Sequence, residues 1–228
     1  TKENTKTHLF HEVLRSIFSD FSPAAEELAH ESFFSGIHKA HAKAKEEGIS
    51  HPEVNIIYIW KSVFERLYDK HYIPKVPSEA LQFKAALIYE NLSNPIFPMP
   101  GLEEILSFLR EKEVKLGIIS NAQFYTLYLF PAFTDKDIYE LGFLPSLSSF
   151  SYRQGRAKPD PKLFSSALNS AYYDFGIEKK DILYIGNDML NDMWTAAENG
   201  IRYALFAGDR RSLRLREGNT RCDLLKPE

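Results

Sequence analysis

Apolar residues recur at helical spacing through the first part of the chain. The first predicted helix carries them three and four positions apart, at Leu9, Phe10, Val13, Leu14, Ile17 and Phe18. Ser22 before Pro23 predicts the start of a second helix, which we expect to end near Gly48. Two further helices are predicted by HPEVNIIYIWKSVFERLYDK, beginning at Pro52, and by PSEALQFKAALIYENLS, capped by Ser78. Short connections between such helices indicate an antiparallel bundle.

One of these predicted helices is rich in aromatic residues. They recur partly at helical spacing, at Tyr58, Trp60, Phe64 and Tyr68. Because of this spacing, core packing is the default expectation for the group, and the alternative for some of its members is to line the cleft that faces the second domain.

The spacing of apolar positions changes after the segment NPIFPMPG, and the three prolines of this segment indicate a domain boundary. We therefore expect a helical domain over residues 1–97 and a second domain over residues 98–228. In the second domain, helical stretches alternate with the apolar runs VKLGII, SSFSY, ILYIG and RYALFA. This alternation is typical of an α/β fold with a parallel sheet covered by helices on both faces.

Polar residues follow several of these predicted strands, where ligands of parallel sheets bind. Ser120 and Asn121 follow VKLGII, and a hydroxyl with free backbone N–H groups at a helix start can hold a phosphate. Lys158 precedes Pro159 in GRAKPDPKLF and offers a mobile positive charge to a phosphate or a carboxylate. Each residue also has a plain structural alternative, as a helix cap or as an exposed loop lysine.

Two carboxylates follow the run ILYIG. Asp188 and Asp192 are four positions apart, so a helix would place them on one face, where like charges repel unless a cation lies between them. Carboxylates are preferred ligands of Mg²⁺. The structural alternative is that Asp188 caps a helix and Asp192 interacts with the helix dipole. Hydroxyl, lysine and carboxylate pair in this order favour phosphoryl transfer.

The stretches LGIISN, AKPDPKLF and YIGNDMLND resemble, in this order, motifs II, III and IV of the haloacid dehalogenase (HAD) superfamily. MPGLEEILSFLREKEVKLGIISN also resembles the family's entry into the core, so the resemblance covers essentially the whole chain. It implies a Rossmann-like parallel-sheet core over residues 98–228 and an all-helical cap domain over residues 1–97.

The resemblance also implies an activity and roles for individual residues. The implied activity is a Mg²⁺-dependent phosphatase that hydrolyses a small phosphorylated metabolite through an aspartyl-phosphate. Ser120 and Asn121 would bind the phosphoryl group, and Lys158 would offset its charge. Ser120 and Lys158 would thereby take part in catalysis, and Asp188 and Asp192 would bind Mg²⁺.

The sequence departs from the family pattern at two points. Asn187 stands where motif IV usually has an aspartate, which leaves the metal to Asp188 and Asp192. Family members also begin with a strand and a DxD motif (motif I), whose first aspartate attacks phosphorus, and no such strand precedes residue 8. The other close acid pair, Asp135 and Asp137, follows no apolar run.

The missing motif I has a structural consequence. In the family its strand lies between the strands of motifs II and IV, and without it both would have unpaired backbone edges in the core. We therefore expect the first core strand to be missing, either because the chain is an N-terminally trimmed form of a longer enzyme or because it is a degenerate homologue. Either way, we expect the chain as given to be inactive, because the nucleophile is not in it.

Two other functions compete with the phosphatase. A metal-free haloacid dehalogenase is disfavoured by the acidic loop GNDMLND. A catalytically inactive HAD-like binding or interaction protein is favoured by the absent motif I and by Asn187. The arginine-rich stretch GDRRSLRLREGNTR could contact an acidic substrate or a partner, but such charge runs are usually solvated loops, as we expect here.

Composition and charge exclude several classes of protein. With Lys plus Arg at 28 and Asp plus Glu at 31, the net charge of -3 argues against nucleic acid as a partner. No apolar run reaches the roughly 18 residues of a membrane span, and TKENTKTHLF does not resemble a signal peptide. The single cysteine, Cys222, excludes an intrachain disulfide and fits a reducing compartment, so we expect a cytoplasmic protein. None of these patterns indicates an oligomeric state.

Overall fold

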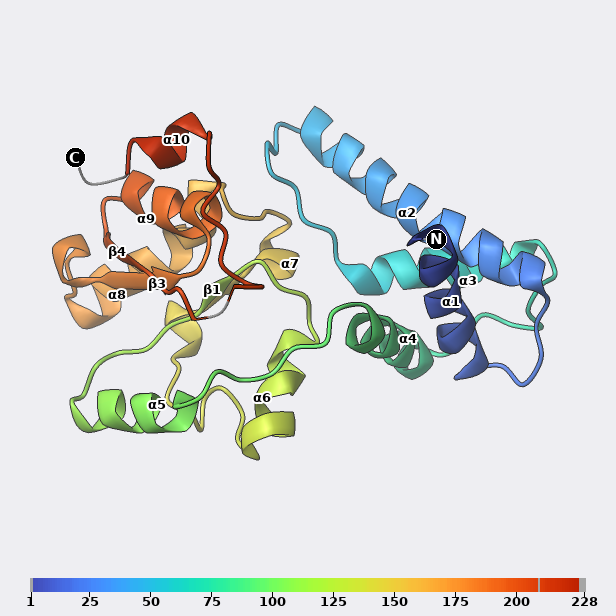
Figure 1. Ribbon diagram of the computed structural model, residues 1–228, viewed down its shortest axis with the longest axis horizontal. Helices are drawn as coiled ribbons and strands as arrows, with labels where there is room; N and C mark the ends of the chain where they lie inside the picture. Colours follow the sequence, from blue (N-terminus) through green and yellow to red (C-terminus); the bar gives the residue numbers. More distant parts are fainter. Residues whose placement is uncertain (1, 209, 226–228) are drawn as a thin grey trace. The chain divides into compact units, whose positions relative to one another are not determined.

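The computed structural model describes residues 2–208 and 210–225 of the chain. The chain divides into two compact units, Thr1–Phe97 and Pro98–Glu228 (Figure 1). Within the described residues, no helix combines the length and the apolar character needed to cross a membrane.

Helices alone make up the regular structure described in the first unit. They are α1 (Lys2–Arg15), α2 (Pro23–Glu46), α3 (Ile56–Asp69) and α4 (Glu79–Ser93). Helix α2 packs on α3, and α1 packs on α4 (Figure 1). The centre of the unit is aromatic: Phe10 and Trp60 are fully buried with ring centroids 5.8 Å apart, and Phe33 lies 5.1 Å from Trp60. This packing follows from apolar stripes at helical spacing.

The helix starts agree with the sequence at two positions and differ at a third. Ser22 and Ser78 lie at the predicted N-cap positions of α2 and α4. Helix α3 begins at Ile56 and not at Pro52, as the sequence indicated. The reason is that the Asn55 side chain accepts a hydrogen bond from the Ile57 backbone N–H at 3.0 Å, which caps the helix there.

The aromatic residues of α3 divide between core and surface. Trp60 and Phe64 are fully buried, but Tyr58 is 70% exposed and Tyr68 is 47% exposed. Core packing, the default expectation for the group, thus holds for Trp60 and Phe64 but not for Tyr58 and Tyr68. Only positions on the stripe facing the other helices are buried, and the tyrosines lie off that stripe.

The second unit contains short parallel strands between helices. The strands are β1 (Ile119–Ser120), β2 (Ser149–Phe150), β3 (Leu183–Gly186) and β4 (Arg202–Leu205). The helices are α5 (Leu102–Glu111), α6 (Thr126–Thr134), α7 (Ser151–Gln154), α8 (Ser165–Phe175), α9 (Thr195–Glu198) and α10 (Thr220–Asp223). Three 3-10 helices are η1 (Pro145–Leu147), η2 (Pro161–Phe164) and η3 (Lys179–Asp181), and one π-helix is η4 (Met189–Trp194). The α/β class and the parallel pairing are as the sequence predicts.

The strands of this unit pair in two separate sheets. Strand β1 pairs with β2, and β3 pairs with β4, in each case in parallel. Side chains and not a backbone ladder connect β3 to β1: the Tyr184 hydroxyl donates to the Ile119 carbonyl oxygen at 2.7 Å. Among the described residues, no strand pairs with both β1 and β3. The expectation of a missing first core strand stays a prediction.

Strand β3 presents different faces to the interior and to solvent. Tyr184 packs against the buried Phe164 with ring centroids 4.9 Å apart, in a cluster with Leu163 and other apolar residues. Leu183 and Ile185, which alternate with Tyr184, are 49% and 60% exposed. Side chains of successive strand residues point to opposite faces, so one face of β3 is packed and the other is open.

Candidate functional site

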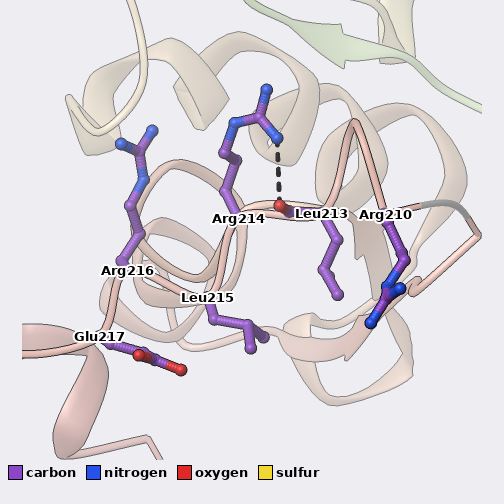
Figure 2. A pocket seen from close by; sticks show the side chains of 6 residues that line it. All are labelled: Arg210, Leu213, Arg214, Leu215, Arg216 and Glu217. Carbon is purple, nitrogen blue, oxygen red and sulfur yellow. Dashed lines mark hydrogen bonds between the residues drawn. The ribbon is translucent and has the colours of Figure 1, made fainter.

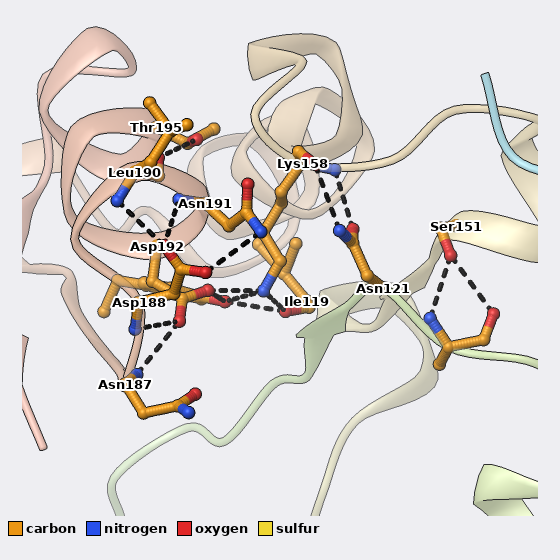
Figure 3. Close-up of polar contacts among 12 residues, drawn as sticks. Ile119, Asn121, Ser151, Lys158, Asn187, Asp188, Leu190, Asn191, Asp192 and Thr195 are labelled. Carbon is orange, nitrogen blue, oxygen red and sulfur yellow. Dashed lines mark hydrogen bonds and ion pairs between the residues drawn. The ribbon is translucent and has the colours of Figure 1, made fainter. Parts of the chain in front are cut away.

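The segment after β1 is fixed by hydrogen bonds from a neighbouring helix. The hydroxyl of Ser151, the first residue of α7, accepts from the Ala122 backbone N–H at 2.8 Å and donates to the Ala122 carbonyl oxygen at 3.1 Å (Figure 3). Ser120 ends β1, and its hydroxyl has no hydrogen-bond partner within the described residues. The structure therefore leaves this hydroxyl available at the carboxyl end of a strand.

Asn121 joins the segment after β1 to the lysine segment. Its side-chain amide donates to the Lys158 carbonyl oxygen at 3.0 Å, and its side-chain oxygen accepts from the Lys158 backbone N–H at 2.7 Å (Figure 3). This pair of hydrogen bonds uses both ends of the amide. Asn121 thus holds Lys158 beside the end of β1, and its side chain is committed to that task.

The Lys158 ammonium group lies at the centre of the site, and its side chain is only 9% exposed. Its Nζ donates to the Ile119 carbonyl oxygen at 3.2 Å, to the Tyr184 hydroxyl at 2.8 Å and to Asp192 Oδ1 at 2.5 Å (Figure 3). An ammonium group has three N–H donors, so all three are satisfied. A buried lysine requires such partners, since burial of an unpaired charge is costly.

Asp192 is held from both sides. Its Oδ1 accepts a hydrogen bond from the Lys158 ammonium group. Its Oδ2 accepts from the backbone N–H groups of Asn187 at 2.9 Å and Asp188 at 3.0 Å. This close approach depends on Gly186, where a Cβ atom would lie 2.4 Å from Asp192 Cγ. The glycine that ends β3 therefore leaves the space in which the carboxylate packs.

Asp188 caps the helical segment that follows it and also pairs with an arginine. Its Oδ1 accepts from the backbone N–H groups of Leu190 at 2.9 Å and Asn191 at 3.1 Å, as expected of an N-cap. The Arg216 guanidinium donates from Nε to Oδ1 at 3.0 Å and from Nη2 to Oδ2 at 2.6 Å. The structural alternative considered for Asp188, a helix cap, is thus present together with an ion pair.

The surroundings shift the pKa values of two groups in the site. Burial by itself raises the pKa of Asp188, but hydrogen bonds from Arg216 and from the backbone of Asn191 and Leu190 outweigh it, so the pKa lies below the usual 3.8. Burial raises the pKa of the Tyr184 hydroxyl, and the nearby Asp192 carboxylate raises it further. Asp188 is therefore ionised and Tyr184 is a neutral hydrogen-bond donor at neutral pH.

Comparison with known proteins supports the relationship indicated by the motifs. Residues 19–200 match the model of the haloacid dehalogenase-like hydrolase family. The chain belongs to this family. The crystal structure of a 2-haloacid dehalogenase from Pseudomonas syringae pv. Tomato DC3000 is similar, with a TM-score of 0.52 and 18% identity over 90% of this chain and 84% of that one. That likeness concerns the fold. None of the curated proteins compared with the chain matches it.

The carboxylates of this HAD-family chain have the right chemistry for Mg²⁺ but are already occupied. Mg²⁺ takes oxygen ligands in a near-octahedral arrangement. Asp188 and Asp192 offer such oxygens, yet each of the four already accepts a hydrogen bond from a protein donor. The described residues contain no group of three or more metal-ligating side chains. The site as it stands does not fit Mg²⁺ unless these donors are displaced.

The expected site residues of the HAD chain come together only in part. Lys158 and Asp192 are in direct contact, and Asn121 holds Lys158 beside the residue that precedes Ser120. Asp188 is turned instead toward Arg216. The sequence therefore predicted that these residues follow the ends of strands in the second unit. Which of them contact one another is known only from the structure.

Sequence reasoning missed Arg216 and Tyr184. Arg216 lies in an arginine-rich segment that was expected to be a solvated loop, and its contact with Asp188 joins residues 28 positions apart. Figure 2 shows this segment, in which arginines and leucines line an open hollow: Arg210, Leu213, Arg214, Leu215, Arg216 and Glu217. For Tyr184 a signal existed, since it is the polar-tipped residue in ILYIG next to two apolar neighbours.

Proposed function

We propose that this HAD-family chain binds the phosphoryl group of a small phosphorylated metabolite and serves in its hydrolysis. The observation that carries the proposal is the Lys158 ammonium group, which bonds to the carbonyl oxygen of Ile119. The next residue in the chain is Ser120, whose hydroxyl has no hydrogen-bond partner among the described residues. A buried positive charge and an unpartnered hydroxyl, both at the end of the same parallel strand, suit an anion with several oxygens. Phosphate, with its several oxygens, fits this description better than a carboxylate whose reacting carbon carries a halogen substituent.

In this proposal each residue has a distinct task. The Ser120 hydroxyl donates a hydrogen bond to a phosphoryl oxygen. The Lys158 ammonium offsets the negative charge that the phosphoryl group brings. Asn121 acts as a positioning residue through the backbone of Lys158. Asp192 orients the ammonium group by accepting one of its hydrogen bonds.

The attacking group is assigned outside the described residues. Attack on phosphorus requires a carboxylate oxygen with a free lone pair that can approach in line. Asp192 is engaged by Lys158 and by two backbone N–H groups, and Asp188 by Arg216. Both are therefore supporting groups in the proposed mechanism. An aspartate from a further segment would supply the nucleophile, as the family resemblance implies.

Mg²⁺ belongs to this proposal as a cofactor whose ligands would be Asp188 and Asp192. A bound divalent ion would neutralise charge on the phosphoryl group. Because both carboxylates are engaged, no step of the reaction is assigned to the ion here.

A turnover assay separates the competing functions. The chain, and a version extended by whatever coding sequence lies upstream, are each incubated with p-nitrophenyl phosphate and with 2-chloropropionate. We expect phosphate release and no chloride release from a version that supplies a nucleophilic aspartate. Chloride release would identify a dehalogenase and overturn the proposal. If a version with an upstream DxD segment binds phosphate but releases neither product, the protein is a binding protein.

A further inference from the structure

The segment 210–217 is attached to the acidic loop by backbone hydrogen bonds. The Met189 N–H donates to the Arg214 carbonyl oxygen at 2.9 Å, and the Arg214 N–H donates to the Asn187 carbonyl oxygen at 2.9 Å. The Asn187 side chain adds a hydrogen bond to the Ser212 carbonyl oxygen at 2.6 Å. These contacts fix the backbone just before Arg216, and its position against Asp188 is therefore built into the fold.

The contact between Arg216 and Asp188 has the geometry of a strong ion pair. Two roughly parallel N–H···O bonds join the guanidinium to both oxygens of the carboxylate, at 3.0 Å and 2.6 Å. The Asp188 side chain is 10% exposed, so water competes weakly with the arginine. Arginine stays protonated at any physiological pH, so only displacement can end the pairing.

The remaining donors leave Asp188 little capacity for another ligand. Asn191 donates to Oδ2 from its side chain at 3.2 Å, in addition to the two backbone N–H groups on Oδ1. A carboxylate has about four lone-pair sites. Of the donors on Asp188, the guanidinium is the one on a long, 40% exposed side chain from a separate segment.

We infer that Arg216 is a built-in competitor of a divalent cation at Asp188. Arg216 pairs with Asp188 and offsets its negative charge, so Asp188 offers no unpaired charge that attracts Mg²⁺. Without Arg216, Oδ2 of Asp188 keeps only the hydrogen bond from the Asn191 side chain, and the site carries an additional negative charge. Arg216 is thus a positioning residue that sets the cation affinity of the site. The inference rests on the proposed function only in assuming that the protein uses a divalent ion in catalysis. Its test measures metal binding and does not require enzymatic activity.

Binding of Mn²⁺, measured from the loss of the free-ion signal in electron paramagnetic resonance, tests this inference on the whole chain. Mn²⁺ prefers oxygen ligands and octahedral geometry, as Mg²⁺ does. We expect Arg216→Gln to tighten Mn²⁺ binding by about tenfold or more, because it removes a positive charge at hydrogen-bond distance from a partly buried carboxylate. Arg216→Lys keeps the charge but loses the two-point geometry. We expect its Mn²⁺ affinity to lie between those of the original chain and Arg216→Gln.

Arg214→Gln is the matched control. It removes the same charge from the same segment, but the Arg214 side chain donates to backbone carbonyl oxygens of Arg211 and Leu213 and not to Asp188. We expect it to change Mn²⁺ affinity by less than about twofold, as for an exposed charge that salt screens. Adding Asp188→Asn to Arg216→Gln should abolish the gain in affinity.

Three results would overturn the inference. They are equal Mn²⁺ affinity of the original chain and Arg216→Gln, an equal gain from Arg214→Gln, and a gain that persists with Asp188→Asn. Circular dichroism and thermal unfolding verify that each variant is folded, and Arg216→Lys provides a milder second variant. Phosphate binding that depends on Ser120 is measured separately, so failure here is distinguishable from failure of the proposed function.

Discussion

The Lys158 ammonium nitrogen lies 2.5 Å from Asp192 Oδ1, and both side chains are at least nine-tenths buried. This ion pair joins the segment before η2 to the segment after β3. It also reaches β1 through the Ile119 carbonyl oxygen. One buried lysine thus connects the two separate sheets of the second unit at the place where a phosphoryl group is proposed to bind.

Removal of the lysine should destabilise the protein. In Lys158→Met, the Asp192 carboxylate remains buried without its counter-ion, and we expect a loss of about 3–5 kcal/mol in the free energy of unfolding. Urea denaturation measures it. The double variant Lys158→Met with Asp192→Asn should recover part of the loss, while Lys162→Met, at an exposed lysine on η2, should have little effect. A stability equal to that of the original chain would show that the pair is not buried.

A methyl group at Gly186 should disturb Asp192. In Gly186→Ala, the new Cβ would lie 2.5 Å or less from Asp192 Cβ, Cγ and Oδ2, which are held by hydrogen bonds and cannot move freely. We expect a loss of about 1–3 kcal/mol in stability, as for other overpacked sites. Gly36→Ala in α2 is the control, because its Cβ would meet no atom closer than 3.6 Å. Thermal unfolding of both variants gives the comparison, and equal melting temperatures would refute the close packing.

The depressed pKa of Asp188 predicts a loss of stability in acid. The folded state binds this proton less readily than the unfolded chain, whose Asp188 titrates near 3.8. The stabilisation is therefore complete above that value and is lost as the pH falls through the lower folded pKa. Unfolding free energies measured from about pH 5 to about pH 2 should fall less steeply for Asp188→Asn than for the original chain. Parallel curves for the two proteins would contradict the assignment.

Asn121 should act on phosphate binding through Lys158. In Asn121→Ala both hydrogen bonds to the Lys158 backbone are lost. We expect a stability loss of about 1–3 kcal/mol for the pair, and a weaker affinity for inorganic phosphate because the ammonium group is less well placed. Titration calorimetry gives the affinity, with the exposed Asn169→Ala as control. If Asn121→Ala loses stability but keeps its phosphate affinity, Asn121 has only a structural role.

Much of the second unit could be predicted from the sequence, because strand ends and helix starts carry local signals. The apolar run before Ser120 and the Gly186 that ends β3 fixed where polar side chains would gather. The order of the motifs then indicated that Lys158 and the Asp192 carboxylate would share one site. Their direct contact agrees with that expectation.

The rest depended on contacts that no local pattern encodes. Asp188 was expected to face a metal with Asp192, but the fold turns it toward Arg216, which approaches from a segment that reads as a solvated charge run. The sequence predicted parallel strands but did not specify their partners, and the structure pairs them as β1–β2 and β3–β4. Which strands pair depends on tertiary structure, and runs of apolar residues do not specify it.

Inorganic phosphate binding by the chain and by Ser120→Ala tests the central claim most directly. Isothermal titration calorimetry gives both dissociation constants, with the exposed Ser166→Ala in α8 as the matched control. A hydrogen bond to a charged group contributes about 1.5–3 kcal/mol, so Ser120→Ala should weaken phosphate binding by about tenfold or more while Ser166→Ala leaves it unchanged. Equal phosphate affinity of the original chain and Ser120→Ala, or no phosphate binding by the original chain, would contradict the account.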